Sequence, residues 1–353
     1  MRGIRLAPAI SALNDTHAAI AVVARGYSNC VSETIITRAP TRIDFGGGWT
    51  DVPPYSDEMG GFVCNVAIAR YATVTIEQPS PGERDALSHV TTTGTSADRS
   101  IAEAAARRFD MIGARIDVRS DFPLGAGLGG SSAAGVATVA ALAALRGDVL
   151  EPSEIAELSR AIEIGDLGIP GGRQDHYAAA FGGALGLRFS AGGVDVHRIP
   201  LDRDLRAEIE RRCVVIYTGK SRISGETIEA VLGAYRKHDP KVLASLDRMR
   251  STAESMAQAL EARDLDALAE LVAEQWTHQR SLHPAIPTPL IDEIIARGTA
   301  AGASGAKALG ASGGGCVLLI ARKDRSDEVR HAVAPLGELL PFAVAEHGVE
   351  RCR

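Results

Sequence analysis

The sequence predicts a protein of mixed helices and strands, in the α/β or α+β class, divided into two domains. The chain has 353 residues, more than a single hydrophobic core usually carries. Apolar residues make up 45% of it and aromatic residues only 4%, which suits a fold built on Ala, Leu, Val and Gly. Strand-like and helix-like patterns occur in both halves of the chain.

The first elements are predicted from alternating and β-branched residues. Residues 33–47 (ETIITRAPTRIDFGG) predict a strand, a turn and a second strand, and residues 60–79 predict one long strand. Residues 100–110 are typical of a helix. Residues 114–123 predict a strand that stops at Pro123.

Four more elements complete the first half. Residues 131–147 are rich in small helix-forming residues and predict a helix closed by Gly147. Residues 151–168 predict a second helix, with Ser153 as its N-terminal cap. Residues 171–190 predict a short helix between two glycine pairs, followed by a strand.

The character of the sequence changes near residue 195. Residues 212–219 predict a strand, and the apolar spacing in residues 226–282 predicts two or three helices. Residues 289–303 predict another helix. Residues 304–321 predict a return to strand through a second glycine-rich turn.

These patterns divide the chain into an N-terminal domain, residues 33–194, and a C-terminal domain, residues 195–353. Residues 1–32 form an N-terminal extension of unknown role. Its basic start resembles a signal peptide, but Asp15 interrupts the apolar stretch early and no clean small-residue cleavage site follows. We therefore expect a cytoplasmic protein.

The net charge and the cysteine content exclude several kinds of binding partner. The net charge of −6 and the absence of a Lys/Arg cluster argue against nucleic acid, and no apolar run approaches the roughly 18 residues of a membrane span. The five cysteines are scattered without ligand spacing, which favours reduced thiols over disulfides or zinc. We expect a monomer or homodimer that acts on a small molecule.

The most informative stretch is SDFPLGAGLGGSSAAG, residues 120–135. Its glycines lie between a predicted strand and a predicted helix, where backbone N–H groups and the helix dipole can bind phosphate. A Walker A motif is absent, because Val214 stands where the first glycine before TGKS belongs. A dinucleotide fingerprint needs a strand ending in an acid about 20 residues later, but that region is helical. A purely structural loop is the remaining alternative.

Three ordered motifs carry a family resemblance. PLGAGLGGSSAAG resembles the second motif of the GHMP kinases, although Gly130 replaces a serine found in many members. RAPTRIDFGGGWTDVPPYSDEMGG resembles the first motif, and GAKALGASGGGCVLLI resembles the third. The resemblance extends from about residue 36 to residue 322. Within the superfamily, the pattern is most similar to anomeric sugar kinases, namely the D-glycero-D-manno-heptose 7-phosphate 1-kinases and the fucokinases.

The resemblance implies an α+β fold of two domains. The N-terminal domain is expected to resemble domain 2 of ribosomal protein S5, and the C-terminal domain a ferredoxin-like fold with extra helices. The active site would lie in the cleft between them. The implied activity is transfer of the γ-phosphoryl group of ATP to the anomeric hydroxyl of a sugar or sugar phosphate.

The resemblance also assigns a phosphate loop and a metal site. The residues expected at the ATP phosphates are Pro123, Gly125, Gly127, Leu128, Gly129, Gly130, Ser131 and Ser132. Ser132 and Glu163 would hold Mg²⁺, a cation that takes oxygen ligands. Sequence alone also allows Ser132 to be a helix cap and Glu163 a solvated carboxylate.

Asp175 matches the family's catalytic carboxylate, and Arg42 is expected beside it, keeping it ionised and stabilising charge in the transition state. A helix-capping role for Asp175 and an exposed strand position for Arg42 are the structural alternatives. His176 is not included in the site, because neighbouring residues on a helix do not share a face.

The sugar is expected to meet residues of the first motif and several flexible basic residues. The expected substrate residues are Asp51, Gly47, Gly48, Trp49, Tyr55, Arg173, Lys220, Arg222 and Gly314. Trp49 and Tyr55 could equally pack in the core, and the basic residues could be solvated loop positions. A free sugar such as L-fucose is the alternative acceptor. A non-catalytic sugar or ATP sensor and a nicotinamide-linked enzyme are alternatives from other classes.

Overall fold

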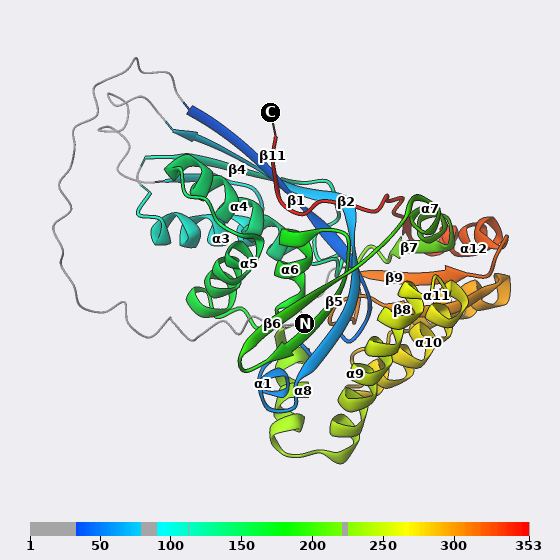
Figure 1. Ribbon diagram of the computed structural model, residues 1–353. Helices are drawn as coiled ribbons and strands as arrows, with labels where there is room; N and C mark the ends of the chain where they lie inside the picture. The colour runs from blue at the N-terminus through cyan, green and yellow to red at the C-terminus, as the bar shows by residue number, and fades with distance from the viewer. Residues whose placement is uncertain (1–32, 79–89, 112, 221–224, 353) are drawn as a thin grey trace, which may run out of the picture. The chain divides into compact units, whose positions relative to one another are not determined.

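The computed structural model describes residues 33–78, 90–111, 113–220 and 225–352, which belong to one compact unit (Figure 1). Its strands form two sheets, and most of its helices pack against one or the other. Because strands and helices are segregated in this way, the predicted α+β class is confirmed. None of the helices in the described ranges has the length and hydrophobicity needed to cross a membrane.

The larger sheet has seven strands. Its main path is β11 (Glu350–Cys352), β1 (Glu33–Gly46), β2 (Gly61–Gln78), β4 (Arg115–Ser120) and β3 (Thr91–Thr93); β5 (Ala184–Ser190) pairs with β2 and with β6 (Gly193–Ile199). Only β3 and β4 pair in parallel among these strands.

β1 differs from the prediction for residues 33–47. The turn predicted within residues 33–47 is wrong, since β1 continues through the region and pairs with β2 along its length. The register shifts between Pro40 and Thr41, where β2 carries two extra residues, Ala69 and Arg70, beside a proline that has no N–H for the ladder.

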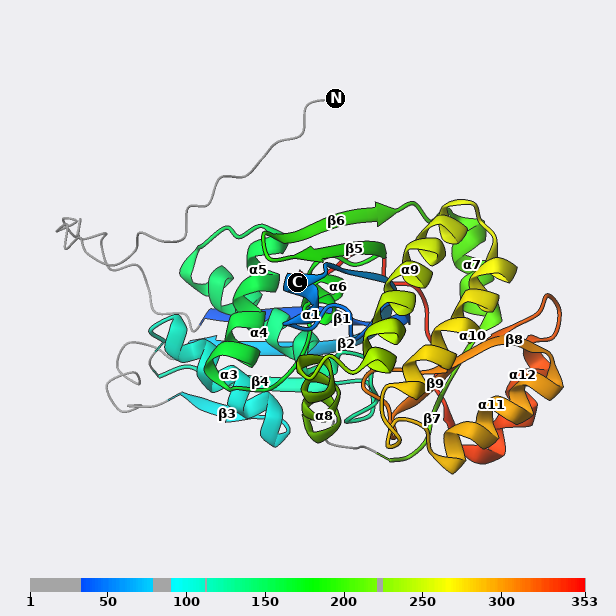
Figure 2. The ribbon, with the colours of Figure 1, turned by 90° about the horizontal axis from the view of Figure 1, so that it is seen from below.

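Helices α3 (Ser96–Arg108), α4 (Gly130–Arg146) and α6 (Gln174–Phe181) pack on the larger sheet, and α5 (Pro152–Arg160) packs on α4 and α6 (Figures 1 and 2). The small side chains of α4 allow it to pack closely on β1 and β2, and Gly147 ends it as predicted. Ser153 is not the cap of α5. Glu151 occupies that position, and the Glu154 carboxylate accepts a hydrogen bond from the Glu151 backbone N–H at 2.8 Å.

The smaller sheet has the order β10 (Glu338–Leu339), β7 (Cys213–Tyr217), β9 (Cys316–Ala321) and β8 (Ala303–Ala308). The predicted helical stretch in residues 226–282 contains three helices, α8 (Gly225–Arg236), α9 (Pro240–Glu261) and α10 (Leu265–Ser281). α10 and α11 (Pro289–Ala301) pack on the strands of this sheet together with α12 (Ser326–Val333).

Several short elements were not predicted, among them α1 (Tyr55–Glu58), β6 and α7 (Arg203–Arg212). A shared core joins the sheets, with Phe45 of β1, Val215 of β7 and Leu318 of β9 in one apolar cluster. β6 runs across the expected domain boundary at residues 194 and 195. The division into residues 33–194 and 195–353 stays a prediction.

Candidate active site

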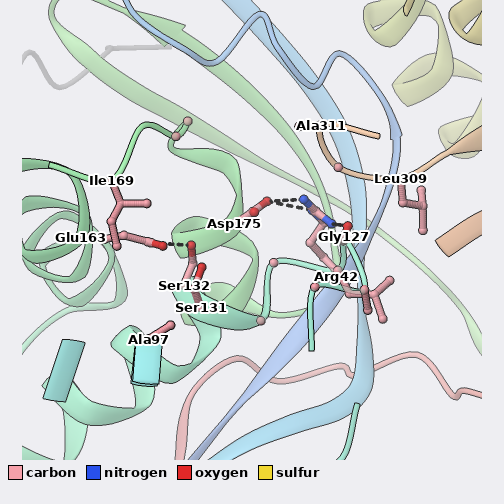
Figure 3. Close-up of a pocket in the computed structure, with 18 of the residues that line it drawn as sticks. Arg42, Ala97, Gly127, Ser131, Ser132, Glu163, Ile169, Asp175, Leu309 and Ala311 are labelled. Carbon is pink, nitrogen blue, oxygen red and sulfur yellow. Dashed lines mark hydrogen bonds and ion pairs between the residues drawn. The ribbon is translucent and has the colours of Figure 1, made fainter. Parts of the chain in front are cut away.

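One large cavity, of about 630 Å³, lies where the end of β1, the start of α4, the start of α6 and the turn after β8 meet. Its walls include residues 122–132, which follow β4, and residues 309–312, which follow β8. Figure 3 shows the side chains that converge on it. Its volume is typical of a pocket for a small molecule.

The glycine-rich loop enters α4 with the backbone conformation that only glycine adopts readily. Gly127 and Gly129 have φ angles of 74° and 77°. A Cβ on Gly127 would lie 2.8 Å from the carbonyl oxygen of Leu309, so the loop packs directly against the third motif. The free N–H groups at the start of α4 and its dipole make this end of the cavity suited to phosphate.

Hydrogen bonds from two distant strands fix this loop. The N–H of Arg42 on β1 donates to the carbonyl of Leu128 at 3.0 Å, and the N–H of Cys316 on β9 donates to the carbonyl of Ala126 at 2.8 Å. Pro123, Gly125, Leu128, Gly130, Ser131 and Ser132 all line the cavity with Gly127 and Gly129. The structure therefore brings every residue of the predicted phosphate loop into one cavity.

Arg42 and Asp175 are in direct contact in the cavity (Figure 3). The Nε of Arg42 donates to Oδ1 of Asp175 at 2.8 Å, and Nη2 lies 2.7 Å from the same oxygen. The Nη1 group donates to the carbonyl of Gly127 at 2.7 Å, so one buried guanidinium joins the carboxylate to the phosphate loop. Asp175 lies in the first turn of α6, and Gly129 leaves room for it, because a Cβ there would lie 3.0 Å from its Cγ.

Ser132 and Glu163 also meet at the cavity wall. The Ser132 hydroxyl donates to Oε2 of Glu163 at 2.9 Å, and both side chains are buried. Burial alone would raise the pKa of the Glu163 carboxyl, but the hydrogen bond and charge of His176, with hydroxyl groups of two serines, hold that pKa below its usual value. Glu163 lies on η1 (Ala161–Asp166), a π-helical turn, a feature frequent at functional sites.

This oxygen pair fits Mg²⁺, which prefers oxygen ligands and keeps waters and substrate phosphates in its coordination shell. In the part of the chain that the structure describes, no cluster of three or more His, Cys, Asp or Glu side chains could hold a metal by itself. A cation at Ser132 and Glu163 would therefore depend on a bound phosphate for further ligands.

Two buried carboxylates, those of Asp51 and Asp44, also line the cavity. Oδ2 of Asp51 accepts a hydrogen bond from the N–H of Gln174 at 3.0 Å. Burial nevertheless raises the pKa of Asp51 to about 6, and the charges of Asp175 and Asp44 act in the same direction. Gly172 makes the close packing possible, since a Cβ at this position would lie 1.9 Å from Oδ2 of Asp51.

The structure separates the predicted substrate residues into two groups. Asp51, Gly48, Trp49 and Gly314 line the cavity. Gly47, Tyr55, Arg173 and Lys220 do not line it; Tyr55 is buried with its hydroxyl on Asp247, Arg173 contacts Asp57 and the Ser190 carbonyl, and Lys220 is exposed. Arg222 lies outside the described residues.

Sequence reasoning missed several residues of this region. Asp44 and Gln174 line the cavity, and His176 contacts Glu163 and Ser132 behind it. The alternation of β1 carried a signal for Asp44, because residues two apart on a strand face the same side and Arg42 was already included. Nothing in the sequence indicated that Lys307 pairs with Asp44, 263 positions away.

Comparison with known proteins agrees with the fold and with the three motifs. The model of the GHMP kinases N terminal domain matches residues 98–183, and the model of the GHMP kinases C terminal domain matches residues 256–337. The chain therefore belongs to the GHMP kinases.

Individual relatives include enzymes named for sugar substrates. The D-glycero-alpha-D-manno-heptose 7-phosphate kinase of Campylobacter jejuni is 27% identical over 91% of this chain and 99% of its own length. The bifunctional fucokinase/GDP-fucose pyrophosphorylase of Arabidopsis thaliana is 26% identical over 82% of this chain, which spans 30% of that longer protein. The crystal structure of a D-glycero-D-manno-heptose 1-phosphate kinase from Bacteroides thetaiotaomicron has a TM-score of 0.71 and 25% identity, and covers 90% of this chain and 99% of its own.

Proposed function

We propose that this protein is an ATP- and Mg²⁺-dependent kinase that phosphorylates the anomeric hydroxyl of a sugar or sugar phosphate. The observation that carries the proposal is the contact of Arg42 with both Asp175 and the Gly127 carbonyl. This contact fixes a carboxylate beside the glycine-rich loop that precedes α4. The same cavity contains the buried Asp51. Membership of the GHMP kinases and the names of the relatives support the choice of ATP and of a sugar.

The phosphate loop performs the first part of the reaction, which is positioning. Residues 123–132 would bind the ATP phosphates through backbone N–H groups at the start of α4, with the helix dipole favouring their negative charge. Ser132 and Glu163 would hold Mg²⁺, which when bound neutralises charge on the phosphates. The short Ser132–Glu163 contact keeps both oxygens at one side of the loop.

Asp175 performs the proton chemistry. Its carboxylate accepts the proton of the anomeric hydroxyl, or orients that hydroxyl, as its oxygen attacks the γ-phosphorus and the bond to the leaving ADP oxygen breaks. Arg42 holds the Asp175 carboxylate in a fixed position through two nitrogens. Asp51 and the backbone at Gly48 would bind other hydroxyl groups of the sugar.

The heptose 7-phosphate branch is the acceptor class that we favour, because the relative that aligns over nearly its full length carries that name. Arg42 is the only Lys or Arg among the described residues that line the cavity, and it is already paired. A distal phosphate therefore needs another cation, and Arg173, Lys220 and Arg222 are our candidates. A free sugar such as L-fucose is the second candidate substrate, in keeping with the fucokinase relative.

The test is release of ADP across a panel of free sugars and sugar phosphates, with phosphorus NMR of the products. Activity on a heptose or related higher-sugar phosphate, with the new ester at C1, would support the favoured branch. Activity on free fucose alone would select the second candidate. If the purified protein binds sugar and ATP but releases no ADP with any sugar, it is a sensor and the kinase proposal is wrong.

A further inference from the structure

The imidazole of His176 is enclosed between a candidate metal ligand and a second hydroxyl group. Its Nε2 lies 3.2 Å from Oε2 of Glu163, and its Nδ1 lies 3.0 Å from Oγ of Ser159. The exposed fractions of His176 and Ser159 are both 1%, so water does not compete for either ring nitrogen. No step proposed above uses this ring.

The two partners of His176 come from one helical surface. Ser159 lies near the end of α5, and Glu163 lies four residues later on the π-helical turn η1. Residues four apart face the same side of a helix, so this surface contacts both nitrogens of the ring at once. The widened turn therefore presents Glu163 toward Ser132 while keeping it over His176.

A glycine on the neighbouring helix allows the arrangement. Gly135 of α4 lies against Ser159, and a Cβ on Gly135 would be only 2.5 Å from the Ser159 hydroxyl. Such a distance is too short for a real contact, so any side chain at residue 135 would displace Ser159. The packing of α4 on α5 thus leaves space specifically where the serine meets the imidazole.

The chemistry of the groups fixes the direction of the hydrogen bond to Glu163. An ionised carboxylate only accepts, so Nε2 of His176 carries a hydrogen and donates to Glu163. The Ser159 hydroxyl pairs with Nδ1 in either state of the ring, because it donates to a neutral ring and accepts from a protonated one. Oε2 of Glu163 also accepts from the Ser132 hydroxyl at 2.9 Å, so this oxygen is held from two sides.

We propose that His176 is a positioning residue that holds the Glu163 carboxylate in place for the divalent cation, and that Ser159 in turn fixes the His176 ring. Groups that orient metal ligands in this way commonly change metal affinity 10- to 100-fold when they are replaced. The inference rests on the proposed function, because it takes Ser132 and Glu163 as the cation ligands.

The experiment measures binding of Mn²⁺ to the full-length protein with ADP, by electron paramagnetic resonance, so that no turnover is needed. H176N and H176Q form a matched pair, because the amide nitrogen of Gln reaches the position of Nε2 whereas that of Asn reaches only that of Nδ1. We expect H176N to weaken Mn²⁺ binding about 10- to 100-fold. H176Q should restore most of the affinity, and S159A should give a smaller loss than H176N.

One further variant and two further measurements distinguish an error in the metal assignment from a loss of the fold and from an error in the role of His176. E163Q tests the metal site itself: if it binds Mn²⁺ as well as the wild type, the proposed function loses its metal assignment, whatever H176N does. Thermal melting and metal-free ADP binding test the fold. If E163Q loses Mn²⁺ while H176N retains wild-type affinity, or if H176N and H176Q lose affinity equally with equal drops in melting temperature, the positioning role of His176 is wrong.

Discussion

The ammonium group of Lys307 lies 2.9 Å from Oδ2 of Asp44 and 3.0 Å from the Asp44 backbone carbonyl, and both side chains are buried. Lys307 belongs to β8 of the smaller sheet, whereas Asp44 belongs to β1 of the larger one. The pair therefore connects the two sheets beside the cavity that Asp44 lines. Burial lowers the pKa of Lys307, and the carboxylate of Asp44 opposes that effect.

Replacing Lys307 with Met should leave the Asp44 carboxylate buried and unpaired. The free energy of unfolding is expected to fall by about 3–5 kcal/mol, measured by urea denaturation. K323M, at an exposed lysine, is the control and should change stability little. Equal denaturation midpoints for K307M and K323M would show that the buried pair does not stabilise the fold.

D175N should lower kcat by about 100- to 10,000-fold, because the amide cannot accept the proton of the sugar hydroxyl. ATP binding should change little, since the phosphate loop binds through its own backbone. Steady-state kinetics and ATP titration provide the measurements. D195N, at an exposed position on β6, is the matched control, and a D175N variant as active as D195N would refute the assignment of the base.

R42K tests the geometry of the guanidinium while retaining its charge. A lysine has a single nitrogen, so it cannot reproduce the three separate nitrogens with which Arg42 contacts Asp175 and the Gly127 carbonyl. We expect kcat to fall at least about tenfold, with a smaller change in KM for the sugar. Kinetics indistinguishable from the wild type would mean that charge alone is sufficient at this position.

The pKa of Asp51 predicts a pH dependence of stability. Because the folded-state pKa is raised from 3.8 to about 6, the folded protein binds a proton between these values that the unfolded chain has released. The stability from this group is fully present below pH 3.8 and is lost as pH rises through about 6. The unfolding free energy of the wild type should therefore fall relative to D51N over this window, by up to ~3 kcal/mol. Parallel profiles for the two proteins would contradict the raised pKa.

G48A should weaken sugar binding selectively. A Cβ on Gly48 would lie 2.5 Å from Oδ2 of Asp44 and 3.0 Å from Nε2 of Gln174, in the end of the cavity that carries Asp51. KM for the sugar should rise while KM for ATP stays near the wild-type value. G233A, on α8 with open space around it, is the control. An equal rise in both KM values would place the effect on the whole cavity and not on its sugar end.

Local patterns predicted much of this fold because the relevant interactions are local. The glycine that ends α4 and the glycine pairs around α6 are signals confined to a few residues. The turn predicted within β1 was wrong, because long-range pairing with β2 outweighs the local signal of Pro40. The short strands β10 and β11 depend on partners far along the chain and left no local pattern.

The sequence predicted only those residues of the site that belong to a recognisable motif. The three motifs gave the residues of the phosphate loop and Asp51, which the structure brings into one cavity. Because neighbouring residues on a helix do not share a face, the sequence predicts no role for His176 beside Asp175. What the sequence could not show is that the other face of α6 meets η1, where Glu163 receives the imidazole. The π-helical turn that makes this contact has no recognisable sequence pattern.

The pairing of β11 with β1 has a consequence for how this protein folds. Arg38 of β1 and Glu350 of β11 form an ion pair across 312 positions of the chain. During synthesis, one edge of β1 stays without its partner strand until residue 352 has left the ribosome. An open strand edge can recruit other chains, so this edge of β1 is exposed to aggregation while the 312 positions between Arg38 and Glu350 are synthesised. β11 thus covers, late in synthesis, part of a strand edge that β1 forms early.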